Sequence, residues 1–243
     1  MDLHELKEKK VGELVKEDIK TAHVFKKYGI DFCCGGGVSI EHACKKQNVS
    51  IEDLVNDLLK IDNNLPQSQD YDHWPLDVLS DHIITTHHSY VEESIPLVLA
   101  YAHKVAQVHG EHHPPVIEIL RLFTEVAREL SSHMLKEEMV LFPYIKHLMA
   151  AKQSDNFPRP PHFGTVENPI HMMEMEHESA GTLLKEIATY SNNYTPPDWA
   201  CNTFKALYAK LDEFEQDLHL HIHLENNILF PKAIQLEKEL SHI

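Results

Sequence analysis

Two short segments of the sequence share the same arrangement of a histidine, a glutamate and a Leu-Phe-Pro ending. They read His133-Met-Leu-Lys-Glu137-Glu-Met-Val-Leu-Phe-Pro143 and His221-Ile-His-Leu-Glu225-Asn-Asn-Ile-Leu-Phe-Pro231. On an α-helix, residues four apart lie about 40° from one another, so each histidine and its glutamate project from one face. Imidazole and carboxylate groups in this arrangement are suitable ligands for a metal ion. The repeat therefore predicts two halves of one metal site.

Each segment is preceded, at nearly the same distance, by a further histidine. His177 precedes the second segment, and the adjacent pair His87 and His88 precedes the first. We expect only one residue of this pair to face the interior of a helical bundle, and the spacing does not decide which. The two halves then offer four imidazoles and two carboxylates in total.

This ligand set favours a pair of metal ions over a single zinc. Six ligands exceed the four of a tetrahedral zinc site, and thiolates are absent from the set. Two ions that share both carboxylates as bridges account for all six ligands, and each ion keeps coordination positions for another ligand. Mixed imidazole and carboxylate ligands suit non-haem iron, with manganese as the alternative.

Two further glutamates lie close to these positions in the sequence. Glu138 lies about 140° from His133 on a helix, so we exclude it as a ligand. Glu174 precedes His177 by three residues, but the other half of the repeat has a threonine at the equivalent position. We therefore expect Glu174 to support a ligand or to face solvent.

The remaining histidines are weaker candidates. His109 ends the first long helical pattern and is a candidate to line the site. His219 and His223 face away from His221 on a helix and are expected to form a surface pair. Three more histidines fall in proline-containing loops and are expected to be solvated: His112, His113 and His162.

Four long helical patterns position these residues. Proline-containing connections separate the patterns, whose approximate spans are 76–109, 115–150, 168–191 and 198–239. Amphipathic helices joined in this way predict an all-α fold with an up-down four-helix bundle. Pro143 and Pro231 cannot donate to the carbonyls four residues earlier, so each helix is expected to kink or tighten below the site.

The first part of the chain reads as a separate small helical unit. We divide the sequence into an N-terminal domain at 1–61, a polar linker at 62–75 and the bundle at 76–243. Apolar residues recur at near-helical spacing from Val11 to Phe25, and Gly29 follows as a stop. Ser39 and Ser50 are the expected N-caps of two further helices.

Two adjacent cysteines, Cys33 and Cys34, lie in a glycine-rich loop of this unit. Backbone N–H groups and the following helix are expected to favour their thiolates. The alternative is that both are small buried side chains. Cys44 and Cys201 are expected to be structural.

The composition limits the partners of the protein. The formal net charge of −16 argues against nucleic acid or an anionic membrane surface as a partner, because both require a basic face. No apolar run approaches the roughly 20 residues of a membrane span, and the N-terminus is not signal-like. Four cysteines, two of them adjacent, do not form a secreted disulfide framework. We expect a cytoplasmic protein.

The motifs together resemble a known family. The bundle resembles the hemerythrin-like fold, and nearly the whole chain resembles the RIC family, the iron-sulfur cluster repair di-iron proteins of the YtfE/ScdA type. The segments that carry this resemblance are Tyr28-Gly-Ile-Asp-Phe-Cys33-Cys34-Gly-Gly, Met175-Glu-His177-Glu-x-Ala-Gly and the two repeated segments described above. The resemblance implies two non-haem irons in an oxo- or hydroxo-bridged centre with bridging glutamates. The implied ligands are His88, His133, Glu137, His177, His221 and Glu225.

The resemblance also implies a function. It indicates repair of iron-sulfur clusters damaged by nitric oxide or peroxide, with the protein acting as an iron donor rather than as an enzyme. Its partners are then damaged or apo iron-sulfur proteins, and Cys33 and Cys34 have a redox or iron-transfer role. A homodimer that places one chain's thiols on the other chain's bundle is compatible with the sequence.

Two alternatives remain open. The di-iron site could reduce nitric oxide, with Cys33 and Cys34 passing electrons, or it could bind oxygen or nitric oxide as a sensor or carrier. The N-terminal thiols argue against a simple carrier, which has no use for them.

Overall fold

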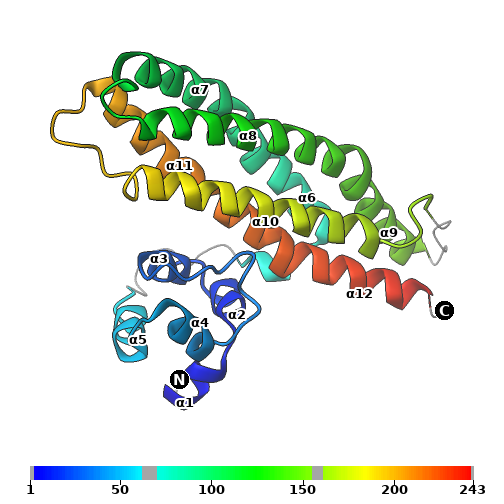
Figure 1. The fold of residues 1–243 in the computed structure, drawn as a ribbon. Coiled ribbons are helices and arrows are strands. Elements are labelled where there is room, and N and C mark those ends of the chain that lie inside the picture. Colours follow the sequence, from blue (N-terminus) through cyan, green and yellow to red (C-terminus); the bar gives the residue numbers. More distant parts are fainter. Residues whose placement is uncertain (1–2, 62–69, 155–160, 242–243) are drawn as a thin grey trace.

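The computed structural model describes residues 3–61, 70–154 and 161–241, and the chain in these ranges forms helices and no strand. The N-terminal helices form a small unit below the long helices in Figure 1. They are α1 (Leu3–Glu8), α2 (Val11–Glu17), α3 (Thr21–Lys27), α4 (Ile40–Gln47) and α5 (Ile51–Leu59). Of the linker expected at 62–75, residues 62–69 lie outside the described residues, and a short 3₁₀ turn, η1 (Tyr71–His73), follows them.

Local signals explain most boundaries of this unit. The side chains of Ser39 and Ser50 accept hydrogen bonds from the first turns of α4 and α5, as predicted. Gly29 has a φ of 65° and follows the end of α3. The expected pattern from Val11 to Phe25 is divided into two helices, because Asp18 has an extended backbone and its side chain accepts from the N–H of Lys20.

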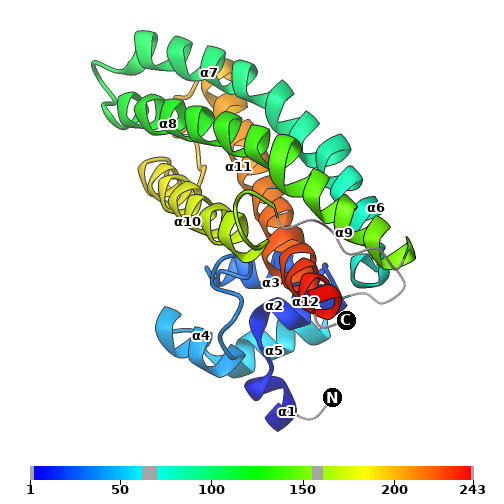
Figure 2. The same cartoon turned by 90° about the vertical axis from the view of Figure 1, so that its right-hand side faces the viewer.

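The rest of the chain forms the predicted four-helix bundle. Its first long helix runs through α6 (Leu76–His82), η2 (Ile83–His88) and α7 (Ser89–His109). The second runs through α8 (Pro115–Lys136), η3 (Glu137–Leu141) and α9 (Phe142–Ser154). The third is α10 (Glu167–Tyr190), and the fourth runs through α11 (Asn202–Leu224), η4 (Glu225–Leu229) and α12 (Phe230–Ser241). Helix α8 packs against α7 and α10, and α11 packs against α7 (Figures 1 and 2).

The segments η2, η3 and η4 are π-helical turns. The N–H of Phe142 donates to the carbonyl of Glu137, five residues earlier, and the N–H of Phe230 donates to that of Glu225. Of the expected kink or tightening at the prolines, the tightening is wrong, because the helix widens just before Pro143 and Pro231. A proline offers no N–H to the previous turn, and the wider turn uses the donor of the preceding residue instead.

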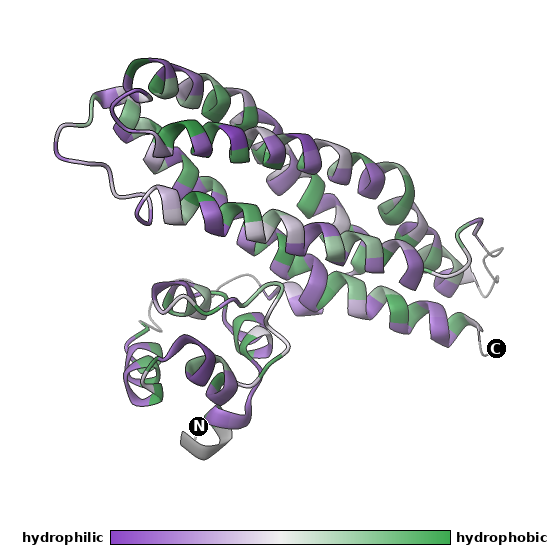
Figure 3. Ribbon diagram, viewed as in Figure 1, coloured by the Kyte–Doolittle hydropathy of each residue, from purple (hydrophilic) through white to green (hydrophobic). Residues whose placement is uncertain are grey.

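The interior of the bundle has a polar level between two apolar clusters. One cluster includes Phe123 and Phe214, and the other includes Phe142 and Phe230. Apolar and polar segments alternate along the bundle helices in Figure 3, as amphipathic packing requires. The π turns lie where the two clusters meet, so polar side chains at that level are shielded from solvent at both ends. None of the helices in the described ranges combines the length and apolar character that a membrane span needs.

The loop with the two cysteines lies against the helix that carries the second repeated segment. The side-chain amide of Asn227, in η4, donates to the carbonyl of Cys33 at 3.2 Å. The ring of Phe32 contacts those of His219 and His223, with centroid distances of 5.8 and 6.0 Å. Lys26 of α3 forms an ion pair with Asp212 of α11 at 2.9 Å. The thiols are therefore held close to one side of the bundle.

We expect Gly36→Ala to destabilise the protein by about 1–3 kcal/mol, because this loop leaves no room for a side chain there. A Cβ at Gly36 would lie 2.4 Å from the carbonyl oxygen of Phe32 and 3.0 Å from the Cα of Gly12. Both contacts are with backbone that cannot move aside. Urea unfolding followed by circular dichroism measures the change. Gly37→Ala is the matched control, since a Cβ at Gly37 would meet nothing within 4 Å, and equal effects of the two changes would contradict this packing.

Candidate metal centre

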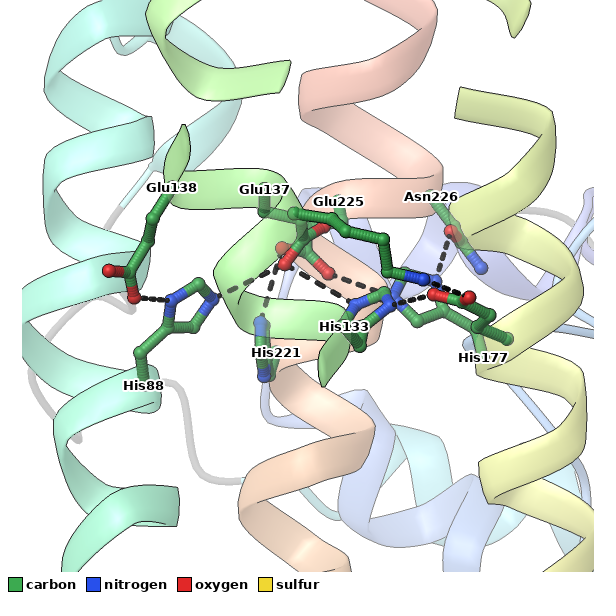
Figure 4. A network of polar contacts seen from close by, with 10 residues as sticks. His88, His133, Glu137, Glu138, His177, His221, Glu225 and Asn226 are labelled. Atoms are coloured by element: carbon green, nitrogen blue, oxygen red, sulfur yellow. Dashed lines mark hydrogen bonds and ion pairs between the residues drawn. The ribbon is translucent and has the colours of Figure 1, made fainter. Parts of the chain in front are cut away.

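Six side chains from four helices meet at the polar level of the bundle (Figure 4). They are the residues that the sequence analysis selected: His88, His133, Glu137, His177, His221 and Glu225. Each is at most 2% exposed to solvent, which is unusual for histidines and glutamates without a partner. The structure thus brings every predicted ligand residue into one buried cluster.

The cluster consists of two overlapping groups. One contains His88, Glu137, His221 and Glu225, and the other contains His133, Glu137, His177 and Glu225. Within each group the candidate ligand atoms all lie within 4.8 Å of one another. Each group therefore takes one histidine from each half of the repeat, and both glutamates belong to both groups.

The distances across the cluster are short, and the Nε2 atoms point inward. Nε2 of His133 lies 3.3 Å and that of His88 lies 3.4 Å from Oε2 of Glu137. On the other carboxylate, Nε2 of His221 lies 3.1 Å from Oε1 of Glu225, and Nε2 of His177 lies 3.2 Å from its Oε2. Each carboxylate thus lies between two imidazoles that belong to different groups.

The cluster fits a pair of cations. Among the described residues, no hydrogen-bond partner exists for Nε2 of His88, for either carboxylate oxygen of Glu137 or for Oε2 of Glu225. Buried polar atoms normally have a partner, because leaving one without costs free energy. Two cations would satisfy these atoms and would neutralise the two carboxylates. The mixture of imidazole and carboxylate donors suits iron or manganese.

The same side chains shift one another's protonation. Burial raises the pKa of Glu225, but the imidazoles of His221 and His177 outweigh this effect and lower the pKa well below its ordinary value. Burial lowers the pKa of His133, and the carboxylate of Glu137 reverses this and raises it to about 10. Without a metal, a proton on His133 therefore supplies part of the positive charge that the carboxylates require.

Three of the four histidines are oriented by a hydrogen bond from their outer nitrogen. Nδ1 of His88 donates to Glu138 at 2.7 Å, and Nδ1 of His177 donates to Asn226 at 2.9 Å. Glu138 belongs to neither metal group and lies on the outer side of His88. The repeat contains the signal for both partners, because each directly follows the glutamate of its segment.

The outer nitrogen of His133 has a carboxylate partner that the sequence analysis missed. Nδ1 of His133 donates to Glu176 at 2.9 Å, and Lys136 also pairs with Glu176. The hydrogen bond from His133 is the main reason that the pKa of Glu176 is lowered to about 2. Glu174 is exposed, so of its two expected roles it has the solvent-facing one.

His221 is the exception, since its Nδ1 has no hydrogen-bond partner among the described residues. Instead, the ring of His87 stacks on it with a centroid distance of 5.5 Å and an interplanar angle of 11°. Nδ1 of His87 donates to Asp217 at 2.9 Å. His87 and His88 are both buried, so the expectation that only one faces the interior is wrong. The two residues lie in a π turn, where the angle between neighbours differs from that of an α-helix.

Two histidines that were expected at the surface, His219 and His223, lie elsewhere. His223 is only 1% exposed and His219 is partly buried, so the expected surface pair is wrong. The loop around Phe32 covers this side of α11, which a helix considered alone does not reveal. Burial lowers the pKa of His223 to about 4.

The histidines at the ends of the bundle lie outside the cluster. His112 and His162 are exposed, as predicted, and His113 is partly buried against Trp199. Nε2 of His109 lies 3.4 Å from the sulfur of Cys201 in a separate group with Trp199. His109 therefore does not line the cluster.

The two neighbouring thiols have different environments. Cys33 is buried and Cys34 is exposed. The backbone N–H groups that were expected to favour thiolates donate instead to the carboxylate of Asp31. A hydrogen bond with Cys34, burial and the charge of Asp31 raise the pKa of Cys33 well above its ordinary value, so the expected thiolate at Cys33 is wrong. Cys44 is buried and Cys201 is exposed.

Comparison with known proteins identifies both parts of the chain. Residues 7–62 match the ScdA_N domain, which is described as a domain of unknown function, and residues 79–233 match the hemerythrin HHE cation binding domain. A Haemophilus influenzae protein named "Probable iron-sulfur cluster repair protein" is 35% identical over 93% of this chain and 97% of its own length. An Escherichia coli protein named "Iron-sulfur cluster repair protein YtfE" is 37% identical over 92% of this chain and 96% of its own length.

Proposed function

The chain belongs to the family of iron-sulfur cluster repair proteins that join an ScdA_N domain to a hemerythrin HHE domain, and on this basis we propose that it repairs damaged iron-sulfur clusters by donating iron. The observation that carries the proposal is the buried cluster in which Glu137 and Glu225 belong to two groups at once. Such a cluster suits two ions of one kind, and its imidazole and carboxylate donors suit iron.

We propose that each cation is held by a histidine from each half of the repeat and by both glutamates. His88 and His221 hold one cation, and His133 and His177 hold the other. Iron held in this way supplies a redox-active cation that can pass to an acceptor protein. Glu138, Asn226 and Glu176 keep three of the imidazole rings oriented, and the apolar clusters above and below exclude water.

The two positions differ, and we propose that the His88 and His221 position releases its iron first. Both histidines of the other position donate to an oxygen, His133 to Glu176 and His177 to Asn226. At the first position only His88 does so, because the outer nitrogen of His221 has no partner among the described residues. A hydrogen bond from the outer nitrogen makes an imidazole a better ligand, so the His221 side of the cluster binds its cation less tightly.

We also propose that the chain has two domains with separate roles. The N-terminal domain at 1–61 carries Cys33 and Cys34, the bundle at 76–243 carries the metal cluster, and the linker at 62–75 joins them. The matches at 7–62 and 79–233 support this division. The cysteines of the protein are all unpaired, which suits the reducing cytoplasm, and damaged or apo iron-sulfur proteins are the proposed partners.

The test is iron transfer to a protein that has lost its cluster. The iron-loaded protein is incubated with an apo iron-sulfur enzyme and sulfide, and recovered enzyme activity is measured together with the iron that has moved. We expect activity to return in proportion to iron lost from the bundle. Catalytic consumption of nitric oxide without any iron transfer would overturn the donor proposal and would support a nitric oxide-reducing enzyme.

We expect the double change Cys33→Ser and Cys34→Ser to slow repair severalfold and to leave the two irons of the bundle in place. The thiols belong to the N-terminal unit, and neither is part of the bundle cluster. Metal analysis and the transfer assay measure the two effects separately. Cys201→Ser, which changes an exposed cysteine elsewhere, is the control and should repair at the normal rate. A double variant with unchanged repair would leave the two cysteines with a packing role only.

A further inference from the structure

The loop between α3 and α4 brings two thiols and one carboxylate together. The side chains are those of Asp31, Cys33 and Cys34, and their candidate ligand atoms all lie within 4.8 Å of one another. We propose that these three residues form a second cation site, separate from the bundle cluster, which binds a thiophilic divalent cation such as cadmium, zinc or ferrous iron. The inference goes beyond the proposed function and stands on the geometry of the loop.

The spacing of the three groups matches a tetrahedral cation. The sulfurs of Cys33 and Cys34 are 3.9 Å apart. Two thiolates on a tetrahedral ion with bonds of about 2.3 Å are about 3.8 Å apart, so the sulfurs already have the required separation. The sulfur of Cys33 lies 3.2 Å from Oδ1 of Asp31. A thiolate and a carboxylate oxygen on such an ion are about 3.5 Å apart, so this pair needs to move by only a few tenths of an ångström.

Backbone contacts hold the carboxylate in this place. Oδ1 of Asp31 accepts from the N–H of Cys33 at 2.9 Å and from the N–H of Cys34 at 3.1 Å. Gly35 leaves space for it, because a Cβ there would lie 3.1 Å from Oδ2 of Asp31. The thiol of Cys33 donates to the same carboxylate. A cation would take the place of that thiol proton and would draw both sulfurs and the carboxylate onto one centre.

The site is open on one side. Asp31 and Cys34 are exposed, whereas Cys33 is buried and its carbonyl accepts a hydrogen bond from Asn227 of the bundle. Three protein ligands leave one position of a tetrahedral ion for water or for a ligand from another protein. A site of this kind suits a cation that is bound and passed on. Ferrous iron from the bundle is one such cation, and that identification alone rests on the proposed function.

The test is a cadmium titration of the full chain, reduced and with iron already in the bundle. Cadmium bound by thiolates absorbs in the ultraviolet, so the signal reports on the cysteines and not on the histidine and glutamate cluster. We expect the absorption to saturate at one cadmium per chain. Cys34→Ser should abolish it, and because Cys34 is exposed the change leaves the packing intact. Asp31→Asn keeps an oxygen for both N–H groups but removes the charge, and it should weaken binding at least about 10-fold.

Cys201→Ser is the matched control, since this cysteine is exposed but lies in the other part of the chain. It should bind cadmium as the unchanged protein does. Absorption that persists in Cys34→Ser, or an unchanged affinity in Asp31→Asn, would overturn the three-ligand site. Iron measured in the same samples reports separately on the bundle, so a protein that binds cadmium but holds no iron would contradict the proposed function and not this inference.

Discussion

Glu225→Gln is expected to remove both cations from the bundle, even though it changes a single atom of one side chain. Glu225 belongs to both groups of the cluster, and its carboxylate lies between His177 and His221. The amide has the same shape, but it brings no negative charge and offers only one oxygen. Loss of an outer hydrogen-bond partner already costs about 10–100-fold in metal affinity, so loss of a shared ligand should cost more. Metal analysis of the purified protein measures this result.

A second glutamate provides the control for this change. Glu174 is exposed on α10 and lies three residues before His177, so Glu174→Gln removes the same charge close to the cluster without touching it. This variant should keep its full metal content. If Glu225→Gln retained one cation per chain, the two positions would not share this carboxylate.

Glu176→Gln is expected to make the two cation positions release their metal at similar rates. In the unchanged protein a chelator should remove metal in a fast phase from the His88 and His221 position and in a slow phase from the other. Glu176 accepts the outer N–H of His133, which belongs to the slow position. Removal of its charge should accelerate the slow phase by about 10–100-fold and leave the fast phase unchanged.

Stopped-flow mixing with a coloured chelator resolves the two phases. Glu174→Gln again serves as the control. It removes a nearby charge, and Glu174 has no hydrogen bond with any of the four histidines in the described part of the chain. A single phase in the unchanged protein would contradict the difference between the positions. If Glu176→Gln accelerated the first phase instead, the slow phase would not come from the position of His133 and His177.

The sequence selected six residues that the structure brings into one cluster, for a reason that lies in the repeat. Helical spacing places His133 with Glu137 and His221 with Glu225, and duplication separates these pairs from the many other histidines. The choice of His88 over His87 needed the family resemblance, because the repeat spacing does not decide between two adjacent histidines. Both residues are buried, but only His88 belongs to the cluster. The all-α fold and the four long helices follow from the same helical periodicity.

The features that escaped prediction depend on contacts between distant parts of the chain. Glu138, at the start of η3, belongs to neither metal group, yet it accepts a hydrogen bond from the outer nitrogen of His88 on another helix. Glu176 and Asn226 bind histidines of the cluster that only the folded bundle brings near. His223 is buried because the loop of the N-terminal unit covers it. The repeat marks the positions of Glu138 and Asn226, but spacing along one helix does not show which histidine of another helix each side chain meets.

The measurement that tests the central claim most directly is anomalous X-ray diffraction from crystals of the iron-loaded protein, recorded at the iron edge. We propose that the bundle holds two irons next to Glu137 and Glu225, the two carboxylates that belong to both groups of the cluster. We expect two peaks, one between His88 and His221 and the other between His133 and His177, each next to both carboxylates. A single peak in the cluster, or scattering at the zinc edge and none at the iron edge, would contradict the claim.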